Sequence, residues 1–213
     1  FKLPFKSFTW FVCAPQAPVR VIRLIDGQII NEEDRAMLPV RGGFVAADAG
    51  QDVAKLSVVE RYGKNGNVGT GFVRGFKLQR GAMAYSMSHD HHNIVVVGVD
   101  DADMAAAVNE VVRLRGGLSV VSGGEVLASM ELPIGGLMSE EGPKEVEAQL
   151  DRMNGAAASL GCTLAAPFMA LSFISLPTVP QLGLTDMGLV DVLNHRLVNQ
   201  LLLVAFGLAL CVL

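Results

Sequence analysis

The chain has 213 residues, 51% of them hydrophobic, which is enough to bury a sizeable core without disulfide bonds. Its 17 lysines and arginines against 21 aspartates and glutamates give a net charge of -4, which removes the electrostatic reason to expect nucleic acid or an anionic membrane as a partner. Three widely spaced cysteines without a C-x-x-C pair argue against a disulfide framework and indicate a reducing cytoplasm.

Residues 1–45 are expected to form a linker and edge strands. Prolines block the hydrogen bonds of helices and strands, which predicts extended connecting chain up to about residue 18. Residues 19–25 alternate apolar side chains with arginine and predict a short strand that ends in a turn at Asp26-Gly27. The chain begins at Phe1, with no basic segment ahead of an apolar stretch, so we expect a piece of a longer protein without a signal peptide.

Residues 46–200 are expected to form one α+β domain. Apolar β-branched runs separated by glycine turns predict strands over residues 56–59, 68–76, 82–87 and 94–97. The run at 94–97 is continuous, which is typical of a central strand covered on both faces.

Helices and a hairpin follow. A helix capped by Asp100 or Asp101 should end at Gly116-Gly117, and a second helix should begin at Pro143. Gly123-Gly124 predicts a hairpin between strands 118–121 and 126–130, and the apolar run 168–176 predicts a further strand. Strands mixed with helices in this way imply a mixed β-sheet layered with helices.

The last residues, 201–213, form an apolar tail without a polar side chain. A membrane span needs roughly 20 apolar residues, so this segment is too short to be one. It is expected to be buried or covered by a partner.

The chemistry of the chain is concentrated in one short segment. Three of the four histidines, His89, His91 and His92, fall within residues 88–93. In extended chain His89 and His91 would face one way, and Asp90 and His92 the other. Either pair could bind a metal, relay a proton or hydrogen-bond a heterocycle, and the residues alone leave equally open a polar turn with solvated imidazoles.

Other kinds of site have less support. A metal site needs three or four ligands, and the remaining histidine, His195, stands alone, so we expect this chain by itself to bind no metal. The glycine-rich stretch 63–75 lacks the phosphate-binding motif G-x-x-x-x-G-K-[ST], and no G-x-S-x-G nucleophile motif is present.

Two dense segments carry a family resemblance. Residues 75–98 contain Arg80-Gly81-Ala82 and then His-Asp-x-His-Asn ahead of an apolar strand, and residues 132–139 read LPIGGLMS. Both resemble the C-terminal domain of bacterial and archaeal adenine deaminases, which belong to the amidohydrolase superfamily. The likeness extends from about Val19 to Asp191. His91 occupies the variable place of the motif, and Tyr62 stands where a histidine is expected after Glu60-Arg61.

The resemblance implies an enzyme in which this chain is one part and an N-terminal barrel is the other. An N-terminal barrel holds manganese or iron, and the whole enzyme hydrolyses adenine to hypoxanthine and ammonia. This chain would be the non-barrel part, inactive alone, with adenine, the barrel and further copies of itself as partners. Matching the motif gives candidate catalytic residues His89, Asp90 and His92, and candidate substrate-binding residues Ser86, Ser88 and Asn93. The alternatives are a non-catalytic purine- or metal-binding module, and a structural or oligomerisation domain.

Overall fold

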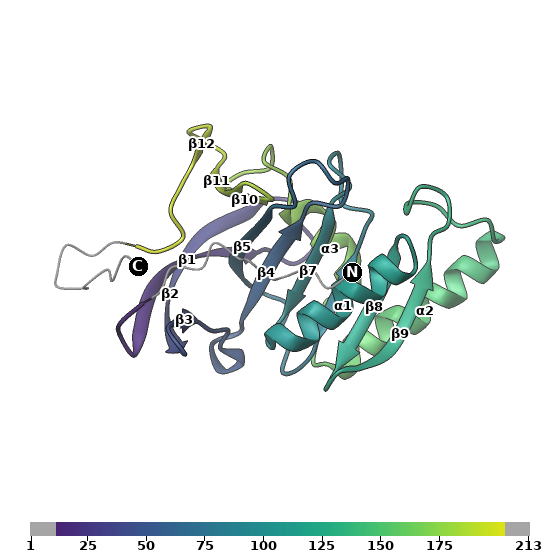
Figure 1. Cartoon of the computed structure of the whole chain (residues 1–213), viewed down its shortest axis with the longest axis horizontal. Coiled ribbons are helices and arrows are strands. Elements are labelled where there is room, and N and C mark those ends of the chain that lie inside the picture. The colour runs from purple at the N-terminus through teal and green to yellow at the C-terminus, as the bar shows by residue number, and fades with distance from the viewer. Residues whose placement is uncertain (1–11, 203–213) are drawn as a thin grey trace.

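The structure is a computed structural model that describes residues 12–202, and it confirms the α+β class. A nine-stranded mixed sheet dominates it, with the strands in the order β3-β2-β1-β5-β4-β7-β6-β8-β9 (Figure 1). In chain order these strands are β1 Gln16–Leu24, β2 Asn31–Arg41, β3 Phe44–Val45, β4 Val53–Val59, β5 Val68–Arg74, β6 Ala82–Tyr85, β7 Ile94–Gly98, β8 Gly117–Ser122 and β9 Glu125–Glu131.

The smaller elements lie around this sheet. A short 3-10 helix, η1 (Ala49–Gln51), precedes β4. A second, three-stranded sheet packs on β5 and consists of β10 (Leu182–Thr185), β11 (Gly188–Asp191) and β12 (Arg196–Leu197).

The first two strands belong to the same sheet as the rest of the chain. β1 and β2 form an antiparallel hairpin whose register runs from Gln16 opposite Pro39 to Leu24 opposite Asn31. β1 then pairs with β5 in parallel, whereas the other described strand pairs are antiparallel. The apolar tail expected over 201–213 falls outside the described residues except at its start, where Leu201 forms an isolated bridge with Val19.

Helices cover both faces of the sheet centre. Ala84 and Val96 point to the face covered by α1 (Asp101–Arg113), while their neighbours Met83 and Val97 point to the opposite face. That opposite face is covered by α2 (Pro143–Ser159) and α3 (Pro167–Ile174). The prediction of a doubly covered central strand at 94–97 is therefore confirmed, because successive β7 side chains enter two separate cores.

The predicted start of α1 and the predicted hairpin are confirmed and connected. The Asp100 carboxylate accepts hydrogen bonds from the N–H groups of Ala102 and Asp103, which caps α1. The Asp103 carboxylate in turn accepts from the N–H groups of Gly123 and Gly124, at 3.0 and 2.8 Å, in the β8–β9 turn. One acidic first turn thus fixes both the helix and the hairpin beside it.

The strand predicted over 168–176 is wrong, because this segment forms α3. Pro167 fits the first turn of a helix, where no N–H is needed. The run is apolar almost throughout, so its periodicity cannot separate a buried strand from a buried helix. Packing against the sheet decides the outcome.

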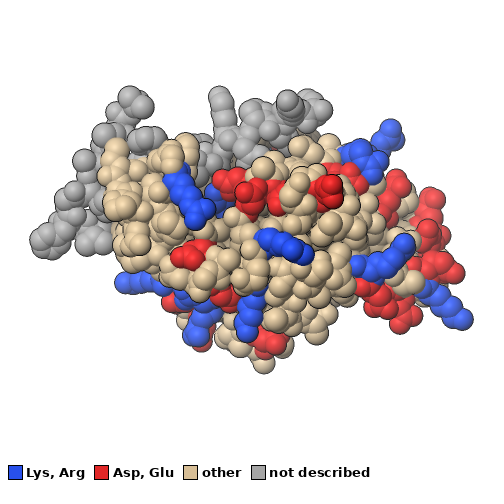
Figure 2. All heavy atoms as spheres, turned by 90° about the horizontal axis from the view of Figure 1, so that it is seen from below, with Lys and Arg blue, Asp and Glu red and all other residues tan. Residues whose placement is uncertain are grey.

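The surface shows no single wide basic face in the view of Figure 2, and acidic side chains gather at the end where β9 and α2 lie. Within residues 12–202, no helix is both long enough and apolar enough to cross a membrane.

Candidate functional site

The two segments that carry the family resemblance lie at the same end of the sheet. Val59 at the end of β4 pairs with Val68 and Ile94, so the loops 60–67 and 86–93 emerge together. On the neighbouring strands, Gly117 at the start of β8 pairs with Glu131 at the end of β9, which places the 132–139 segment at this end as well. We call this set of loops the loop end.

The 86–93 loop is a tight turn rather than extended chain. Asp90 and His92 have left-handed backbones, with φ of 64° and 49°. The His91 N–H donates to the His89 carbonyl at 2.8 Å, and the His92 N–H donates to the Ser88 carbonyl at 3.1 Å. The alternation expected for an extended chain, with His89 and His91 facing one way, therefore does not occur.

Ser86 and Ser88 hold this turn from inside. Both residues are fully buried. The Ser86 hydroxyl donates to the Gly136 carbonyl at 2.6 Å and accepts from the Gly117 N–H at 2.8 Å. The Ser88 hydroxyl donates to the Asn93 carbonyl at 2.8 Å. Both hydroxyls are thus engaged with the chain itself, and they tie the loop to its neighbours.

His91, the variable position of the motif, is part of this internal frame. Its Nδ1 accepts from the Asn93 N–H at 3.0 Å, so the ring carries its proton on Nε2. Burial lowers the pKa of His91, an effect that the Ser175 backbone and the Asp186 and Asp90 carboxylates oppose. A neutral imidazole that is half-buried and bonded to its own loop acts as a structural group.

Glu60 and Arg61 lock the neighbouring loops. The Glu60 carboxylate accepts from four backbone N–H groups of residues 62–66, at 2.5 to 3.3 Å. Burial alone would raise the pKa of Glu60, but these donors together hold it below its ordinary value. Arg61 donates from Nε to the His92 carbonyl at 2.6 Å and from Nη2 to the Gly135 carbonyl at 2.8 Å. Arg61 therefore joins three loops.

Two glycines pack face to face beneath Arg61. A Cβ on Gly116 would lie 2.1 Å from the Gly136 Cα, and a Cβ on Gly136 would lie 2.4 Å from the Arg61 Nη1. Both glycines have positive φ, 128° and 75°. Gly116 and Gly136 are thus required by close contact as well as by turn conformation, whereas Gly135 is required by its turn conformation alone.

His89 is the predicted site residue that lines a cavity. A pocket of about 220 Å³ lies between the sheet and the helices α2 and α3, and His89 and Met87 form its edge. The His89 ring contacts the Phe173 ring, with centroids 4.7 Å apart, and its Nδ1 is hydrogen-bonded to the Ser172 hydroxyl of α3. Among the residues predicted for the site, Asp90 is exposed beside this edge, His92 is half-buried, and Asn93 is buried.

The cavity contains polar groups that the sequence analysis did not identify. Tyr85 from β6, Asn154 from α2 and Ser172 from α3 line it among apolar side chains. Burial raises the pKa of Tyr85, so its phenol keeps its proton. Ser172, one of two serines within the apolar run 168–176, and a tyrosine directly before the histidine loop were the available signals. Neither pointed to the other, because the chain brings them together only in the folded state.

The donor set does not fit a metal ion. In the part of the chain that the structure describes, no three His, Cys, Asp or Glu side chains gather closely enough to hold one. Two of the loop's ring nitrogens are also engaged already, since Nδ1 of His91 accepts from the Asn93 N–H and Nδ1 of His89 is bonded to Ser172.

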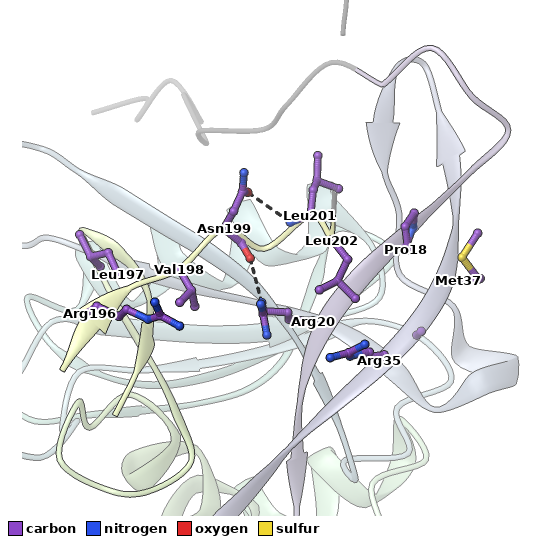
Figure 3. Close-up of a pocket in the computed structure, with 11 residues that line it drawn as sticks. Pro18, Arg20, Arg35, Met37, Arg196, Leu197, Val198, Asn199, Leu201 and Leu202 are labelled. Carbon is purple, nitrogen blue, oxygen red and sulfur yellow. Dashed lines mark hydrogen bonds between the residues drawn. The ribbon is translucent and has the colours of Figure 1, made fainter. Parts of the chain in front are cut away.

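A second, larger hollow lies away from the loop end, between β1, β2 and residues 196–202 (Figure 3). Three arginines line its walls, but Arg20 is paired with Glu33 and Arg196 with Asp191. Arg20 also donates to the Asn199 carbonyl, which ties β1 to the 196–202 segment. This hollow holds mostly satisfied charges and carries no residue of the predicted site.

Comparison with known proteins agrees with the resemblance. The family model of the adenine deaminase C-terminal domain matches residues 28–196. The adenine deaminase of Desulforamulus reducens is 57% identical over 180 residues, which are 84% of this chain and 31% of that protein. The adenine deaminase of Dehalococcoides mccartyi (strain CBDB1) is 42% identical over 197 residues, 92% of this chain and 34% of that protein.

A third relative, the adenine deaminase of Methylobacterium nodulans, is 48% identical over 186 residues, 87% of this chain and 33% of that protein. The chain thus spans about a third of the length of the curated relatives it matches. With a family model that covers most of its length and relatives this similar, the chain belongs to the adenine deaminase C-terminal domain family.

Proposed function

We propose that this chain is the C-terminal part of an adenine deaminase, which hydrolyses adenine to hypoxanthine and ammonia, and that the 86–93 loop forms one wall of its purine pocket. One observation carries the second half of this proposal: the loop places His89 at the edge of a cavity and is held there by buried hydrogen bonds. The names of the relatives support the first half.

Different parts of the loop would have different tasks. His89 has Nδ1 bonded to Ser172, which leaves Nε2 as the ring atom that can bond a heterocycle. Asp90 is exposed beside it and would accept an N–H of the base. Ser86, Ser88 and the backbone of Asn93 would act by fixing the loop, because their hydrogen bonds are made within the chain. His92 contributes its carbonyl to Arg61.

The reactive ion belongs elsewhere in this proposal. We assign the manganese or iron that the resemblance implies to an N-terminal barrel, because the described residues offer no ligand set. Contact with that barrel would exclude water from the pocket and strengthen electrostatic interactions there.

The test uses the full-length protein and this chain side by side. We expect the full-length protein to release ammonia from adenine and the 213-residue chain not to do so, with or without added metal. His89→Ala in the full-length protein should lower kcat/KM about 10- to 100-fold, because a contact made to the reacting base is lost. His195→Ala, in an exposed turn between β11 and β12, is the matched control and should leave kcat/KM unchanged.

Two results would contradict the proposal. Turnover by the metal-supplemented chain alone would show that the chemistry does not need a barrel. An unchanged kcat/KM in His89→Ala would remove the loop from the purine pocket.

A structural role has its own supporting observation. Apolar side chains stand exposed near the loop end, among them Met138, Met169 and Met187, each with more than half of its surface accessible. Exposed apolar surface of this kind is typical of a face that a partner covers, here the barrel or a second copy. Sedimentation of the 213-residue chain distinguishes them, since a monomer at high concentration counts against the second copy.

A further inference from the structure

The cavity beside α3 contains a polar group that the protein itself does not satisfy. Tyr85 is 2% exposed, and its hydroxyl makes no hydrogen bond of ordinary geometry among the described residues. The Ser172 hydroxyl is near enough to influence the pKa of Tyr85, but its described hydrogen bond is to His89. Other buried hydroxyls nearby are bonded, namely those of Ser86, Ser88 and Ser172. Leaving one buried hydroxyl unpaired is unfavourable, and such exceptions in folded proteins call for a reason such as a ligand or ordered water.

The walls around Tyr85 suit a flat ring. Phe168 lies tilted against Tyr85 with ring centroids 6.4 Å apart, and Leu118 and Leu150 complete an apolar lining. Met87 and Met169 stand at the rim, each partly exposed, and thioether sulfurs make favourable contacts with aromatic rings. The volume of about 220 Å³ is below the range typical of drug-sized ligands and fits a smaller molecule.

We propose that this cavity is a preformed site for a small heteroaromatic base and that the Tyr85 phenol donates a hydrogen bond to a ring nitrogen of that base. The choice of a purine as the probe rests on the proposed function; the site itself rests on the cavity and its unpaired hydroxyl. Tyr85 is then a specificity-determining residue, since a ring of the same shape without an acceptor would leave the phenol unsatisfied.

The second polar edge of the cavity comes from the histidine loop. Ser172 joins His89 to α3 through the bond to Nδ1, and Asn154 of α2 lines the same cavity. Burial raises the pKa of the Tyr85 phenol, and the nearby Ser172 hydroxyl only partly offsets this rise. The phenol therefore stays protonated and remains a hydrogen-bond donor at the pH of an assay. A base held here would have a donor at its inner edge and mixed donors and acceptors toward the mouth.

The experiment measures binding of adenine and of indole to the 213-residue chain by calorimetry. Indole has a similar bicyclic shape but no ring-nitrogen acceptor. We expect adenine to bind with a dissociation constant on the order of 1 mM or tighter, because a small ligand gains little per contact. Tyr85→Phe should weaken adenine binding about tenfold, the effect of one buried hydrogen bond, and should not weaken indole binding.

The chain offers a matched control, since Tyr62 is its other tyrosine. Tyr62 is exposed, and Tyr62→Phe removes a hydroxyl outside the cavity, so adenine binding should be unchanged. Thermal unfolding supplies a second readout: Tyr85→Phe should unfold at the same or a higher temperature, because it removes an unsatisfied hydroxyl and keeps the ring. A purely structural phenol would show the opposite, a lower unfolding temperature without selective loss of adenine.

Each remaining outcome overturns the inference. Equal binding of adenine by Tyr85→Phe and the unaltered chain would remove the phenol as the selecting group. Absence of adenine binding to the unaltered chain would show that the cavity is not a preformed site. The deaminase assignment stands or falls separately, on ammonia release by the full-length protein, and the place of the 86–93 loop is tested by His89→Ala in that protein.

Discussion

Ser86 connects three segments of the loop end, and its removal should be measurable as lost stability. Its hydroxyl is the described hydrogen-bond partner of the Gly117 N–H, and it donates to the Gly136 carbonyl. Because Ser86 is fully buried, Ser86→Ala leaves a donor and an acceptor without water to replace the hydroxyl. At roughly 1–3 kcal/mol for each of these two buried groups left unpaired, we expect the free energy of unfolding to fall by about 2–6 kcal/mol.

Ser119 provides the graded control. It is equally buried, but its hydroxyl makes one bond, at 2.8 Å, to the Ala107 carbonyl inside α1. That carbonyl sits where the helix supplies its own donor, so Ser119→Ala should cost only about 1 kcal/mol. Urea unfolding at neutral pH measures both variants, with the midpoint shifting and the slope of free energy against urea unchanged.

A free energy of unfolding for Ser86→Ala within roughly 0.5 kcal/mol of the unaltered chain, the scatter of neutral surface changes, would contradict this expectation. A loss equal to that of Ser119→Ala would show that only one of the two Ser86 bonds matters. A loss of adenine binding without a loss of stability would make Ser86 a substrate contact rather than a frame residue.

Three further predictions concern the same end of the sheet. Glu60→Gln should lower the free energy of unfolding measured in urea by about 1–3 kcal/mol, since an amide cannot accept four N–H groups as a carboxylate does. The stability difference between Glu60→Gln and the unaltered chain should shrink as the pH falls through the lowered pKa of Glu60, because the carboxylate then becomes protonated. The unfolding temperature of the unaltered chain should decline as the pH drops below about 6.5, because the pKa of His91 is lowered by folding and the unfolded chain therefore takes up a proton first. Thermal unfolding of His91→Asn over the same pH range should show a smaller decline. Gly116→Ala should destabilise the chain by about 3 kcal/mol or more, since its Cβ would meet the Gly136 Cα. In Gly155→Ala the new Cβ in α2 meets nothing within 4 Å, so this variant should be stabilised by up to about 1 kcal/mol. Soluble yield and unfolding temperature distinguish the two variants.

The sequence predicted those elements whose signals are local. β7 followed from a continuous β-branched run, and α1 from the capping carboxylate of Asp100. Edge strands were expected within residues 1–45, but the bounds of β2 were not predicted, because its charged start at Glu32 and Glu33 carries no apolar strand signal. In the structure these carboxylates pair with Arg23 and Arg20 across the hairpin, and that pairing exists only once the two strands are side by side.

The same distinction holds for the candidate site. The histidine loop could be found from its composition, and its place at the end of a strand followed from the apolar run beside it. The cavity could not be found, because its walls come from β6, β8, α2 and α3, which are far apart in the chain. The predicted strand over residues 168–176 also hid the position of Ser172, since side chains alternate between two faces along a strand but recur every three to four residues on one face of a helix such as α3.

The edge strand β9 of the large sheet bears on whether two copies of the chain can pair edge to edge. β9 has no described strand beyond it, so its outer backbone groups are open to pairing with another chain. If two copies paired antiparallel about Ala128, Glu125 of each copy would face Glu131 of the other. Like charges directly opposite one another disfavour such pairing, and the acidic surface of α2 nearby adds to the repulsion. This like-charge contact therefore disfavours edge-to-edge growth of the sheet into a fibre.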